Sequence, residues 1–350
     1  MVGAVIVKDG KIIGEGYHKK YGELHAERNA IASLTESAEG AVIYVTLEPC
    51  CHHGKTPPCT EAIIEQKIRK VVIGSRDPNP KVAGKGVQML REAGVTVVED
   101  FMREECDQLN PVFFHYITMK TPYVVMKYAM TLDGKIATKT GASKWITGEA
   151  ARKEVQHMRH QYMGIMAGIG TVLADDPMLN VRVEGWKSPV RIVCDSKLRI
   201  PPDSQIVKSA GKYRTIVAYA DWKNTEEKIK ILHTMGVETI CCPDEKNQID
   251  LKKLMTDLGS KGIDSILLEG GGTLNDSALR AGIVKEVQAF VAPKLFGGVA
   301  GKTPVEGIGV EFPSEAVELK YTDICQIGED IRIRCQVCEK KQEESCLQES

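Results

Sequence analysis

Three side chains in the first sixty residues are of the types that bind zinc. They are His25, Cys50 and Cys59. Imidazole nitrogen and thiolate sulfur are usual zinc ligands, and three protein ligands leave a fourth position open for water. Glu27 lies two residues after His25 and could serve as the acid and base beside a metal-activated water. The alternative is a buried histidine near unrelated cysteines. We interpret the set as a catalytic zinc site.

The order of these residues matches the signature of zinc deaminases, H-x-E followed by P-C, in which the glutamate transfers protons and is not a ligand. His25-Ala26-Glu27 and Pro49-Cys50 supply both parts. The usual second part is P-C-x-x-C, whereas Cys59 here is nine positions after Cys50. The loop between the thiolates is therefore enlarged. Cys51 could be mistaken for a ligand, but Cys50 is the cysteine that follows the required proline.

Length and composition limit the functional class. With 350 residues the chain can form two domains, each with its own core. The formal net charge of −1 gives no field for a polyanion, so we expect no nucleic-acid partner. We also expect no membrane span and no signal peptide. Eleven scattered cysteines do not form a secreted disulfide framework. We therefore expect a cytoplasmic protein that acts on a small molecule.

Residues 1–120 predict a three-layer α/β/α domain. The apolar runs 2–7 and 12–16 flank Asp9-Gly10, which is typical of a hairpin turn. Beyond the hairpin, the pattern predicts helices at 25–34, 59–64 and 84–93, and strands at 41–47, 71–74 and 95–98. The strand at 41–47 leads into Glu48-Pro49-Cys50 at its carboxyl end, where open α/β sheets keep their sites. The candidate zinc ligands are therefore expected together at one edge of the sheet.

A connector ending at Pro122, after an expected helix at 104–114, sets a domain boundary near Lys120. In residues 121–338 we expect strands at 123–129, 163–167, 190–195, 215–219, 237–240, 263–269 and 286–292, and helices at 149–159, 226–235, 251–259 and 273–281. The runs 317–321 and 331–337 favour an antiparallel pair. The second domain is therefore predicted to contain a mostly parallel, twisted sheet with an antiparallel edge. The polar tail at 339–350 is expected to be disordered.

Two glycine-containing stretches in the second domain are candidates for ligand binding. Glu269-Gly270-Gly271-Gly272-Thr273 lies where a strand is expected to give way to a helix. Glycine there lets the backbone approach a pyrophosphate, and a helix N-terminus favours negative charge. Many such triplets are only tight turns, however. Gly168-Ile169-Gly170-Thr171 is expected as a second turn, with Asp175 and Arg182 beyond it as ligand contacts or as a capping pair.

Longer motifs resemble a known family. HAE, PCCHHGKTPPC and SRDPNP resemble the deaminase half of the RibD family of bifunctional riboflavin biosynthesis proteins. DGKIA, SKWITG, GIGTVLADDP, LNVR and EGGGTL resemble its reductase half. The resemblance implies a cytidine-deaminase-like three-layer domain followed by a dihydrofolate-reductase-like α/β domain. It also implies zinc-dependent deamination of a pyrimidine ribosyl phosphate, then reduction of the ribosyl group by NADPH, and a possible homo-oligomer.

The same resemblance implies individual contacts. In the deaminase half, the expected substrate contacts are His18, His52 and Lys55, each of which could instead be a solvated loop residue. In the reductase half, the expected NADPH contacts are Ala129, Trp145, Thr147, Thr171, Asp175, Ser196, Gly271, Gly272 and Thr273. The expected contacts to the ribosyl phosphate are Ser143, Arg159, Leu179, Arg182 and Glu269. Trp145 could instead be a core aromatic, and Asp175 could help to open the sugar.

The chain departs from the family at its start, because members have a further helix and a Pro-Asn-Pro turn before the strand at 2–7. We therefore expect an uncovered apolar face, weak or absent deamination and poor solubility. Two alternatives remain open. Ammonia release from cytidine would favour a nucleoside or tRNA deaminase fused to an unrelated dehydrogenase. Zinc content without ammonia release from any pyrimidine would favour a non-enzymatic zinc-binding scaffold.

Overall fold

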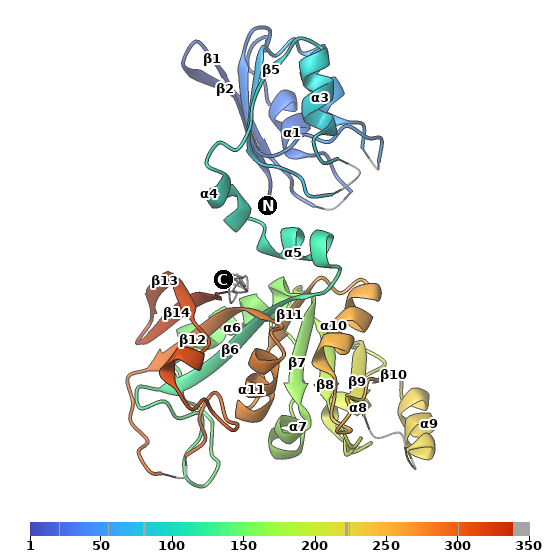
Figure 1. Cartoon of the computed structure of the whole chain (residues 1–350), viewed down its shortest axis with the longest axis vertical. Coiled ribbons are helices and arrows are strands. Elements are labelled where there is room, and N and C mark those ends of the chain that lie inside the picture. Colours follow the sequence, from blue (N-terminus) through green and yellow to red (C-terminus); the bar gives the residue numbers. More distant parts are fainter. Residues whose placement is uncertain are drawn as a thin grey trace, which may run out of the picture. The chain divides into compact units, whose positions relative to one another are not determined.

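The computed structural model divides the chain into two units, Met1–Met119 and Lys120–Ser350. Each unit has its own sheet and its own hydrophobic core (Figure 1). The structure describes residues 1–20, 22–54, 56–79, 82–220, 223, 225–299 and 301–338. The tail at 339–350 lies outside the described residues. Among the described helices, none is long and apolar enough to cross a membrane.

Unit 1 contains a five-stranded sheet with the order β2-β1-β3-β4-β5. The strands are β1 (Gly3–Lys8), β2 (Lys11–Tyr17), β3 (Val42–Leu47), β4 (Lys70–Ser75) and β5 (Thr96–Val98). β1 pairs antiparallel with β2 and β3, whereas β3, β4 and β5 are parallel. The predicted hairpin is confirmed, and Asp9 and Gly10 both have positive φ, as its tight turn requires.

The helices of unit 1 lie on both faces of this sheet. They are α1 (Ala26–Ala32), α2 (Cys59–Glu65), α3 (Lys85–Glu92), α4 (Arg103–Gln108) and α5 (Pro111–Met119). α1 contacts α2, α2 contacts α3, and α4 packs on β4, where the Cys106 side chain meets Gly74. The expected single helix at 104–114 is wrong. Proline lacks a backbone N–H and is tolerated only in the first turn of a helix, so a new helix begins at Pro111.

Two glycines in β2 allow α1 to pack directly on the strand. A Cβ atom at Gly16 would lie 2.3 Å from the Ala30 nitrogen, and one at Gly14 would lie 2.5 Å from the Ala30 oxygen. Ala26 and Ala30 are fully buried in the core of unit 1. This contact between backbones fixes the position of α1, and with it the predicted ligand His25 and the predicted acid and base Glu27.

Unit 2 contains a nine-stranded sheet with the order β10-β9-β8-β7-β11-β6-β12-β14-β13. The strands are β6 (Tyr123–Thr131), β7 (Gly164–Gly168), β8 (Val190–Cys194), β9 (Thr215–Tyr219), β10 (Val237–Cys241), β11 (Ser265–Leu268), β12 (Val284–Ala292), β13 (Leu319–Ile327) and β14 (Asp330–Val337). The first seven strands in this order are parallel, whereas β14 pairs antiparallel with β12 and β13. The expected mixed sheet is confirmed.

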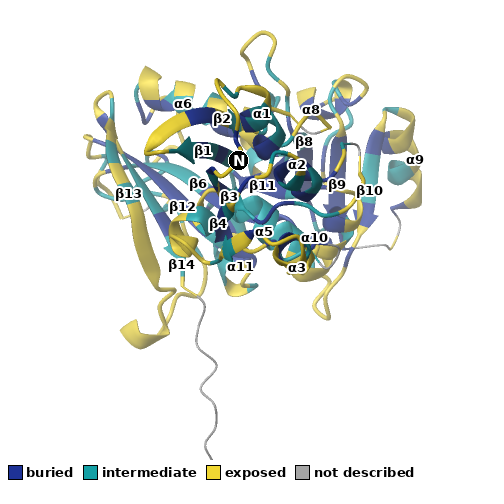
Figure 2. Cartoon of the chain, turned by 90° about the horizontal axis from the view of Figure 1, so that it is seen from above, coloured by how far each residue is buried: buried dark blue, intermediate teal, exposed yellow. Residues whose placement is uncertain are grey.

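Both faces of the parallel part of the unit 2 sheet are covered. Ile192 belongs to one hydrophobic cluster and its neighbour Val193 to another, so the apolar runs of the parallel strands are buried on both sides (Figure 2). The covering helices are α6 (Glu149–Gln161), α7 (Ile169–Asp175), α8 (Gln205–Lys208), α9 (Glu226–Thr234), α10 (Leu251–Ser260) and α11 (Gly272–Arg280), with a 3-10 turn at Pro313–Glu315. The stretch at 168–171, expected as a turn, instead begins α7.

The adjacent strands β7 and β11 create a crevice at their carboxyl ends. The helix after β7, α7, contributes Ile169 and Val172 to one cluster, whereas α11, after β11, contributes Ala278 to the other. The chain therefore leaves these two neighbouring strands toward opposite faces of the sheet. Such a divergence is the point at which open α/β sheets bind ligands.

We expect Gly16→Ala to destabilise unit 1 by about 1–3 kcal/mol, because the added methyl group forces α1 away from β2. Zinc content after purification should fall in parallel, since His25 moves with α1. The checks are thermal unfolding and metal analysis of the full chain. Gly3→Ala is the matched control, because the nearest heavy atom to a Cβ at Gly3 is 4.0 Å away. Equal melting temperatures for the two variants would contradict this account.

Candidate functional sites

The three predicted zinc ligands come together in unit 1. The His25 Nδ1 atom lies 3.4 Å from Cys50 Sγ and 3.5 Å from Cys59 Sγ, and the three donor atoms all lie within 4.8 Å of one another. With the usual zinc bond lengths, nitrogen and sulfur ligands of a tetrahedral site are about 3.6 Å apart. The donor set and its spacing therefore fit Zn²⁺. Cys51 is not part of this group.

Local contacts hold the ligands in place. His25 directly precedes α1, Cys50 follows β3, and Cys59 is the first residue of α2. The backbone N–H of Cys59 donates to Cys50 Sγ at 3.4 Å. Arg28 of α1 donates to the carbonyl oxygens of Pro57 and Pro58, at 2.9 and 2.7 Å. The loop before Cys59 is thus fastened to the helix that carries Glu27.

The two cysteines differ in their affinity for a proton. Hydrogen bonds from Cys59 lower the pKa of Cys50 to about 4. The pKa of Cys59 is raised, first by its hydrogen bond to Cys50 and then by burial. The hydrogen bond to Cys50 raises the pKa of His25. One thiolate is therefore present before a metal binds, and the bound cation stabilises the second.

Glu27 lies in the first turn of α1, beside the Cys59 thiol. Its side chain is 3% exposed, and burial raises the pKa of Glu27 to about 7. A carboxyl group whose pKa is close to neutral can both accept and return a proton at physiological pH. The geometry therefore supports an acid and base at the position that the sequence predicts.

The predicted substrate contacts of unit 1 have different surroundings. The His18 ring lies edge-on to His25, with centroids 5.4 Å apart. In the described part of the chain, His18 Nε2 is buried and has no hydrogen-bond partner. His52 is exposed and close enough to Asp77 to lower its pKa, although burial raises that pKa overall. Lys55 lies outside the described residues.

Sequence reasoning did not assign a role to Glu48. In the structure, this residue connects the strand end before Cys50 to the segments around α3. Its carboxylate is 4% exposed and accepts the backbone N–H groups of Asp77, Gly84 and Val87, at 3.4, 3.1 and 3.4 Å. These bonds fasten the segment before and within α3 to the strand end that carries Cys50. The available signal was an acidic residue directly after a buried apolar strand.

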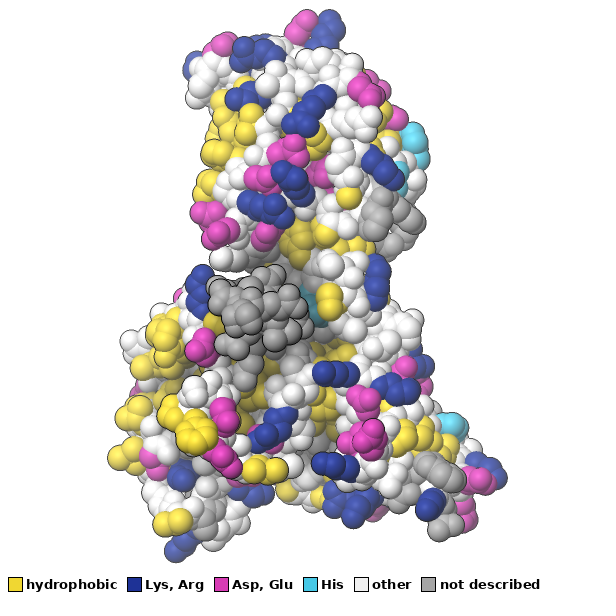
Figure 3. Space-filling view, in the orientation of Figure 1, with side chains coloured by type: hydrophobic (Ala, Val, Ile, Leu, Met, Phe, Trp, Pro, Cys, Tyr) yellow, Lys and Arg dark blue, Asp and Glu magenta, His cyan; other side chains and the backbone are white. Residues whose placement is uncertain are grey.

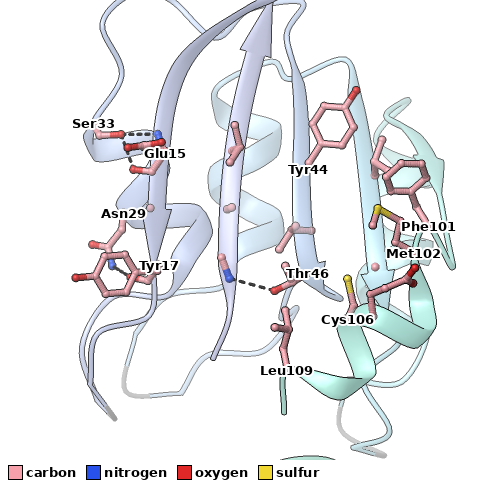
Figure 4. Close-up of a pocket in the computed structure, with 18 of the residues that line it drawn as sticks. Glu15, Tyr17, Asn29, Ser33, Tyr44, Thr46, Phe101, Met102, Cys106 and Leu109 are labelled. Carbon is pink, nitrogen blue, oxygen red and sulfur yellow. Dashed lines mark hydrogen bonds between the residues drawn. The ribbon is translucent and has the colours of Figure 1, made fainter. Parts of the chain in front are cut away.

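A larger hollow in unit 1 contains none of the three metal ligands. Its volume is about 930 Å³, and it lies against β1–β4 beside α4. Figure 4 shows Tyr44, Phe101, Met102, Cys106 and Leu109 along one side of it. Large apolar side chains are exposed there, and the group of possible metal ligands found among the described residues lies elsewhere in unit 1. We therefore assign the chemistry of unit 1 to the metal centre.

Unit 2 has a pocket of about 510 Å³ at the carboxyl ends of β7, β8 and β11. It is lined by six of the nine residues predicted to bind NADPH, namely Thr171, Asp175, Ser196, Gly271, Gly272 and Thr273, and by Ser143 from the predicted substrate set. Ala129, Trp145 and Thr147 are not among the lining residues. Trp145 is 60% exposed and stacks against the Arg152 guanidinium at 4.6 Å, so it is not a core aromatic.

The glycine triplet has more than one function. A Cβ atom at Gly272 would lie 2.7 Å from the Thr303 oxygen, and one at Gly270 would lie 2.7 Å from Asn275 Oδ1. These two glycines are therefore required for packing. A Cβ at Gly271 would meet nothing within 4 Å, so its backbone faces open space at the start of α11. A ligand phosphate can approach the helix N-terminus at this point.

The predicted substrate residues Arg159 and Glu269 form a buried ion pair. Arg159 donates to both carboxylate oxygens of Glu269, at 2.7 and 2.8 Å. Burial opposes the charge, but Arg159 and Lys127 hold the pKa of Glu269 at about 2. Arg159 is thus already paired, whereas Arg182 is exposed. Leu179, which is also a predicted substrate contact, lies three residues before Arg182 in the sequence. It is buried and has a positive φ.

Sequence reasoning missed Lys127, which lies on β6. Burial lowers its pKa, and the nearby Glu269 carboxylate opposes that shift. The ammonium group therefore contributes to the charge balance of the Arg159–Glu269 pair. The signal was a lysine within the apolar run 123–129, where a charge is costly unless it is paired.

Comparisons with known proteins cover both units. The family described as "RibD C-terminal domain" matches residues 122–333, and "Cytidine and deoxycytidylate deaminase zinc-binding region" matches residues 1–75. The riboflavin biosynthesis protein RibD of Actinobacillus pleuropneumoniae is 56% identical over 331 residues, which are 95% of this chain and 88% of that protein. The Escherichia coli K12 protein of the same name is 40% identical, covering 94% and 91%.

Solved structures give the same result. RibD of Acinetobacter baumannii is 37% identical, with a TM-score of 0.82 over 97% of this chain and 92% of that chain. A Thermotoga maritima structure, described as diaminohydroxyphosphoribosylaminopyrimidine deaminase/5-amino-6-(5-phosphoribosylamino)uracil reductase, is 38% identical, with a TM-score of 0.82 over 96% and 92%. This chain is similar to these proteins along nearly its whole length.

Glu48→Ala should lower the zinc content and the melting temperature of unit 1, because three backbone N–H groups, those of the buried Asp77 and Val87 among them, lose their acceptor. The expected destabilisation is about 1–3 kcal/mol. Metal analysis and thermal unfolding are the measurements. The exposed Glu36, altered in the same way, should leave both unchanged. If Glu48→Ala retained zinc and stability like this control, the carboxylate would not hold the site together.

Glu269→Gln should destabilise unit 2 by about 3–5 kcal/mol at pH 7, because Arg159 and Lys127 lose their counter-charge. The folded pKa of Glu269, about 2, lies below its ordinary value of 4.5. Its stabilising contribution is therefore complete above pH 4.5 and is lost as the pH falls toward 2. Urea unfolding at pH 7, 5 and 3.5 should show the two proteins converging as the pH falls. The exposed Glu245, altered to Gln, serves as the control; a pH-independent difference would refute the assignment.

Proposed function

The chain belongs to the RibD family of riboflavin biosynthesis proteins, and we propose that its two units divide a deamination and a reduction between them. The deaminase acts on 2,5-diamino-6-ribosylamino-4(3H)-pyrimidinone 5′-phosphate. The reductase then converts the ribosyl side chain to ribityl, giving 5-amino-6-ribitylamino-uracil 5′-phosphate. Family membership decides against the two alternatives, an unrelated fusion and a non-enzymatic scaffold.

The residue assignments rest on one observation: the chain contains two sites with different chemical groups. Unit 1 has a zinc-type donor set with a buried carboxyl group beside it. Unit 2 has a pocket of about 510 Å³ at the N-terminus of α11, at the point where neighbouring strands diverge. The first suits hydrolysis and the second suits a dinucleotide. We therefore assign deamination to residues 1–120 and reduction to residues 121–338.

In unit 1, His25, Cys50 and Cys59 would hold Zn²⁺, which would lower the pKa of a water molecule to near 7. Glu27 accepts a proton from the attacking water and returns a proton to the nitrogen that leaves as ammonia. Its raised pKa fits both steps. The orphaned His18 Nε2, next to His25, is available to contact the substrate, and His52 lies on the neighbouring exposed loop.

In unit 2, NADPH supplies the hydride. The open backbone at Gly271 would hold the pyrophosphate of NADPH, and Thr171, Asp175 and Ser196 line the same pocket. Glu269 is kept ionised by Arg159 and Lys127, so its carboxylate can accept hydrogen bonds from hydroxyl groups of the opened sugar. The exposed Arg182 binds the substrate phosphate, whereas Arg159 orients Glu269. The protein thereby positions the sugar carbon against the nicotinamide.

The class of partner and the cellular location of the enzyme are inferred from its charge and its cysteines. The net charge is −1, and basic and acidic side chains are interspersed on the face shown in Figure 3. This supports small-molecule substrates, because a net charge near zero provides little long-range attraction for a polyanion. Ten cysteines in the described residues are free, which suits a reducing cytoplasm. We retain a homo-oligomer as part of the proposal on family grounds.

The test is ammonia release from the diaminopyrimidine phosphate, followed by oxidation of added NADPH. Glu27→Gln should keep zinc but lose ammonia release by about 10²–10⁴-fold, while still reducing the deaminated intermediate. Reduction is measured separately on that intermediate. Glu36→Gln should match the parent in both assays. A Glu27→Gln protein that turns over within tenfold of the parent, or zinc loss in that variant, would refute this role.

A further inference from the structure

Arg191, a residue of β8, is fully buried and takes no part in the chemistry proposed for unit 2. Its side chain lies on the sheet face covered by α7 and α8, as that of Val193 does two positions later. Burial lowers the pKa of Arg191 to about 10, so the group stays charged at neutral pH. Its hydrogen bonds among the described residues go to neutral oxygen atoms, namely the carbonyls of Met178, Ile206 and Tyr213 and the hydroxyls of Ser209 and Thr215. A buried cation is costly, so the segments that it holds are informative.

Two guanidinium groups hold the chain on either side of Leu179. Arg191 Nη1 donates to the Met178 carbonyl oxygen at 3.1 Å, and Arg159 Nη1, from α6, donates to the Asn180 carbonyl oxygen at 3.2 Å. Leu179, between these carbonyls, has a φ of 47°. This left-handed conformation is unfavourable for residues other than glycine and persists only where the surroundings impose it. The two arginines therefore maintain a strained turn.

Further hydrogen bonds extend this support to Arg182. The carbonyl oxygen of Tyr213 accepts from Arg191 Nη2 at 3.0 Å, and the Tyr213 hydroxyl accepts from Asn180 Nδ2 at 3.4 Å. The Arg191 guanidinium carbon also lies 5.2 Å from the centre of the Tyr213 ring. On the other side, the Arg182 N–H donates to Gln156 Oε1 at 2.9 Å. The exposed Arg182 side chain therefore extends from a backbone that is held at several points.

We propose that Arg191 is a positioning residue that sets the substrate affinity of unit 2 without touching the substrate. Its hydrogen bond to the Met178 carbonyl fixes the left-handed turn at Leu179. That turn sets the point from which Arg182 reaches the substrate phosphate, so the inference rests on the proposed reductase function. A guanidinium suits this task because its planar fork bonds several acceptors in fixed directions, whereas the ammonium group of lysine is a point charge.

The test is the steady-state kinetics of the full chain as it reduces the supplied deaminated intermediate at saturating NADPH. Arg191→Lys should raise the KM for the intermediate by about tenfold, because a misplaced Arg182 loses part of a charge-assisted bond to the phosphate. The kcat should stay within about threefold of the parent value, since the loss affects binding rather than the hydride transfer. In a chain that already carries Arg182→Gln, Arg191→Lys should raise the KM no further, because the two residues act through one contact.

Two further variants separate positioning from general stability. Thr215→Val removes the hydrogen bonds of Arg191 to β9 and leaves the bond to Met178. It should lower the melting temperature as Arg191→Lys does, but keep the KM within about twofold of the parent value. Tyr213→Phe removes only the hydroxyl that accepts from Asn180, so it decides the question if Arg191→Lys does not fold. It should raise the KM about two- to fivefold with little change in melting temperature.

Three outcomes would overturn the inference. A parent-like KM in Tyr213→Phe, and in Arg191→Lys where it folds, would show that this support does not set substrate affinity. Additive effects of Arg191→Lys and Arg182→Gln would show that Arg191 does not act through Arg182. An equal rise in KM for Thr215→Val would show a general structural effect. In contrast, a parent-like KM in Arg182→Gln would refute the proposed phosphate contact, and a parent chain that does not oxidise NADPH with this intermediate would refute the reductase function.

Discussion

Close contacts at glycine set the positions of both sites. A Cβ at Gly16 would lie 2.3 Å from the Ala30 nitrogen, and one at Gly86 would lie 2.2 Å from the Pro49 oxygen. In unit 2, Gly272 packs in the same way against Thr303. At each point a helix comes against a strand or segment that carries candidate site residues. A close-packed protein interior cannot be expanded without a loss of stability. The distance between each helix and its strand therefore fixes the distances between the candidate site residues that they carry.

Three buried glutamates show how surroundings decide what a carboxyl group does. Glu27 has no cation bonded to its carboxylate in the described structure, and burial raises its pKa to about 7, so it can exchange protons. Glu269 is also largely buried, with 13% of its side chain exposed, but two cations hold its pKa at about 2, so it stays ionised at neutral pH. Glu48 accepts three backbone N–H groups and acts as a structural bond between segments. The three residues are of one type, and the groups that surround each carboxyl group determine its pKa and its role.

The sequence predicts best what depends on local pattern. Donor types near the ends of apolar runs predicted His25, Cys50 and Cys59 as one site, because parallel strands end at a common edge. Long-range partners are not visible in such patterns. The bidentate bond between Arg159 and Glu269 joins residues 110 positions apart, so the sequence could nominate both for the substrate but not their pairing. The Glu48 contacts were missed for the same reason, and the split at Pro111 was missed because an apolar run outweighed a helix-breaking residue.

Because the chain has a near-neutral net charge, its phosphorylated ligands must be recognised by individual side chains at each site. A net charge of −1 provides no long-range attraction, so each phosphate must be bound by individual cations at its own site. The pairing of each guanidinium then separates the roles of the two arginines proposed to serve the substrate of unit 2. Arg159, at 2.7 Å from Glu269, is neutralised and orients its partner, whereas the side chain of Arg182 is exposed and is available for the substrate phosphate. A bidentate ion pair makes a guanidinium part of the scaffold, and an exposed guanidinium can still bind a ligand.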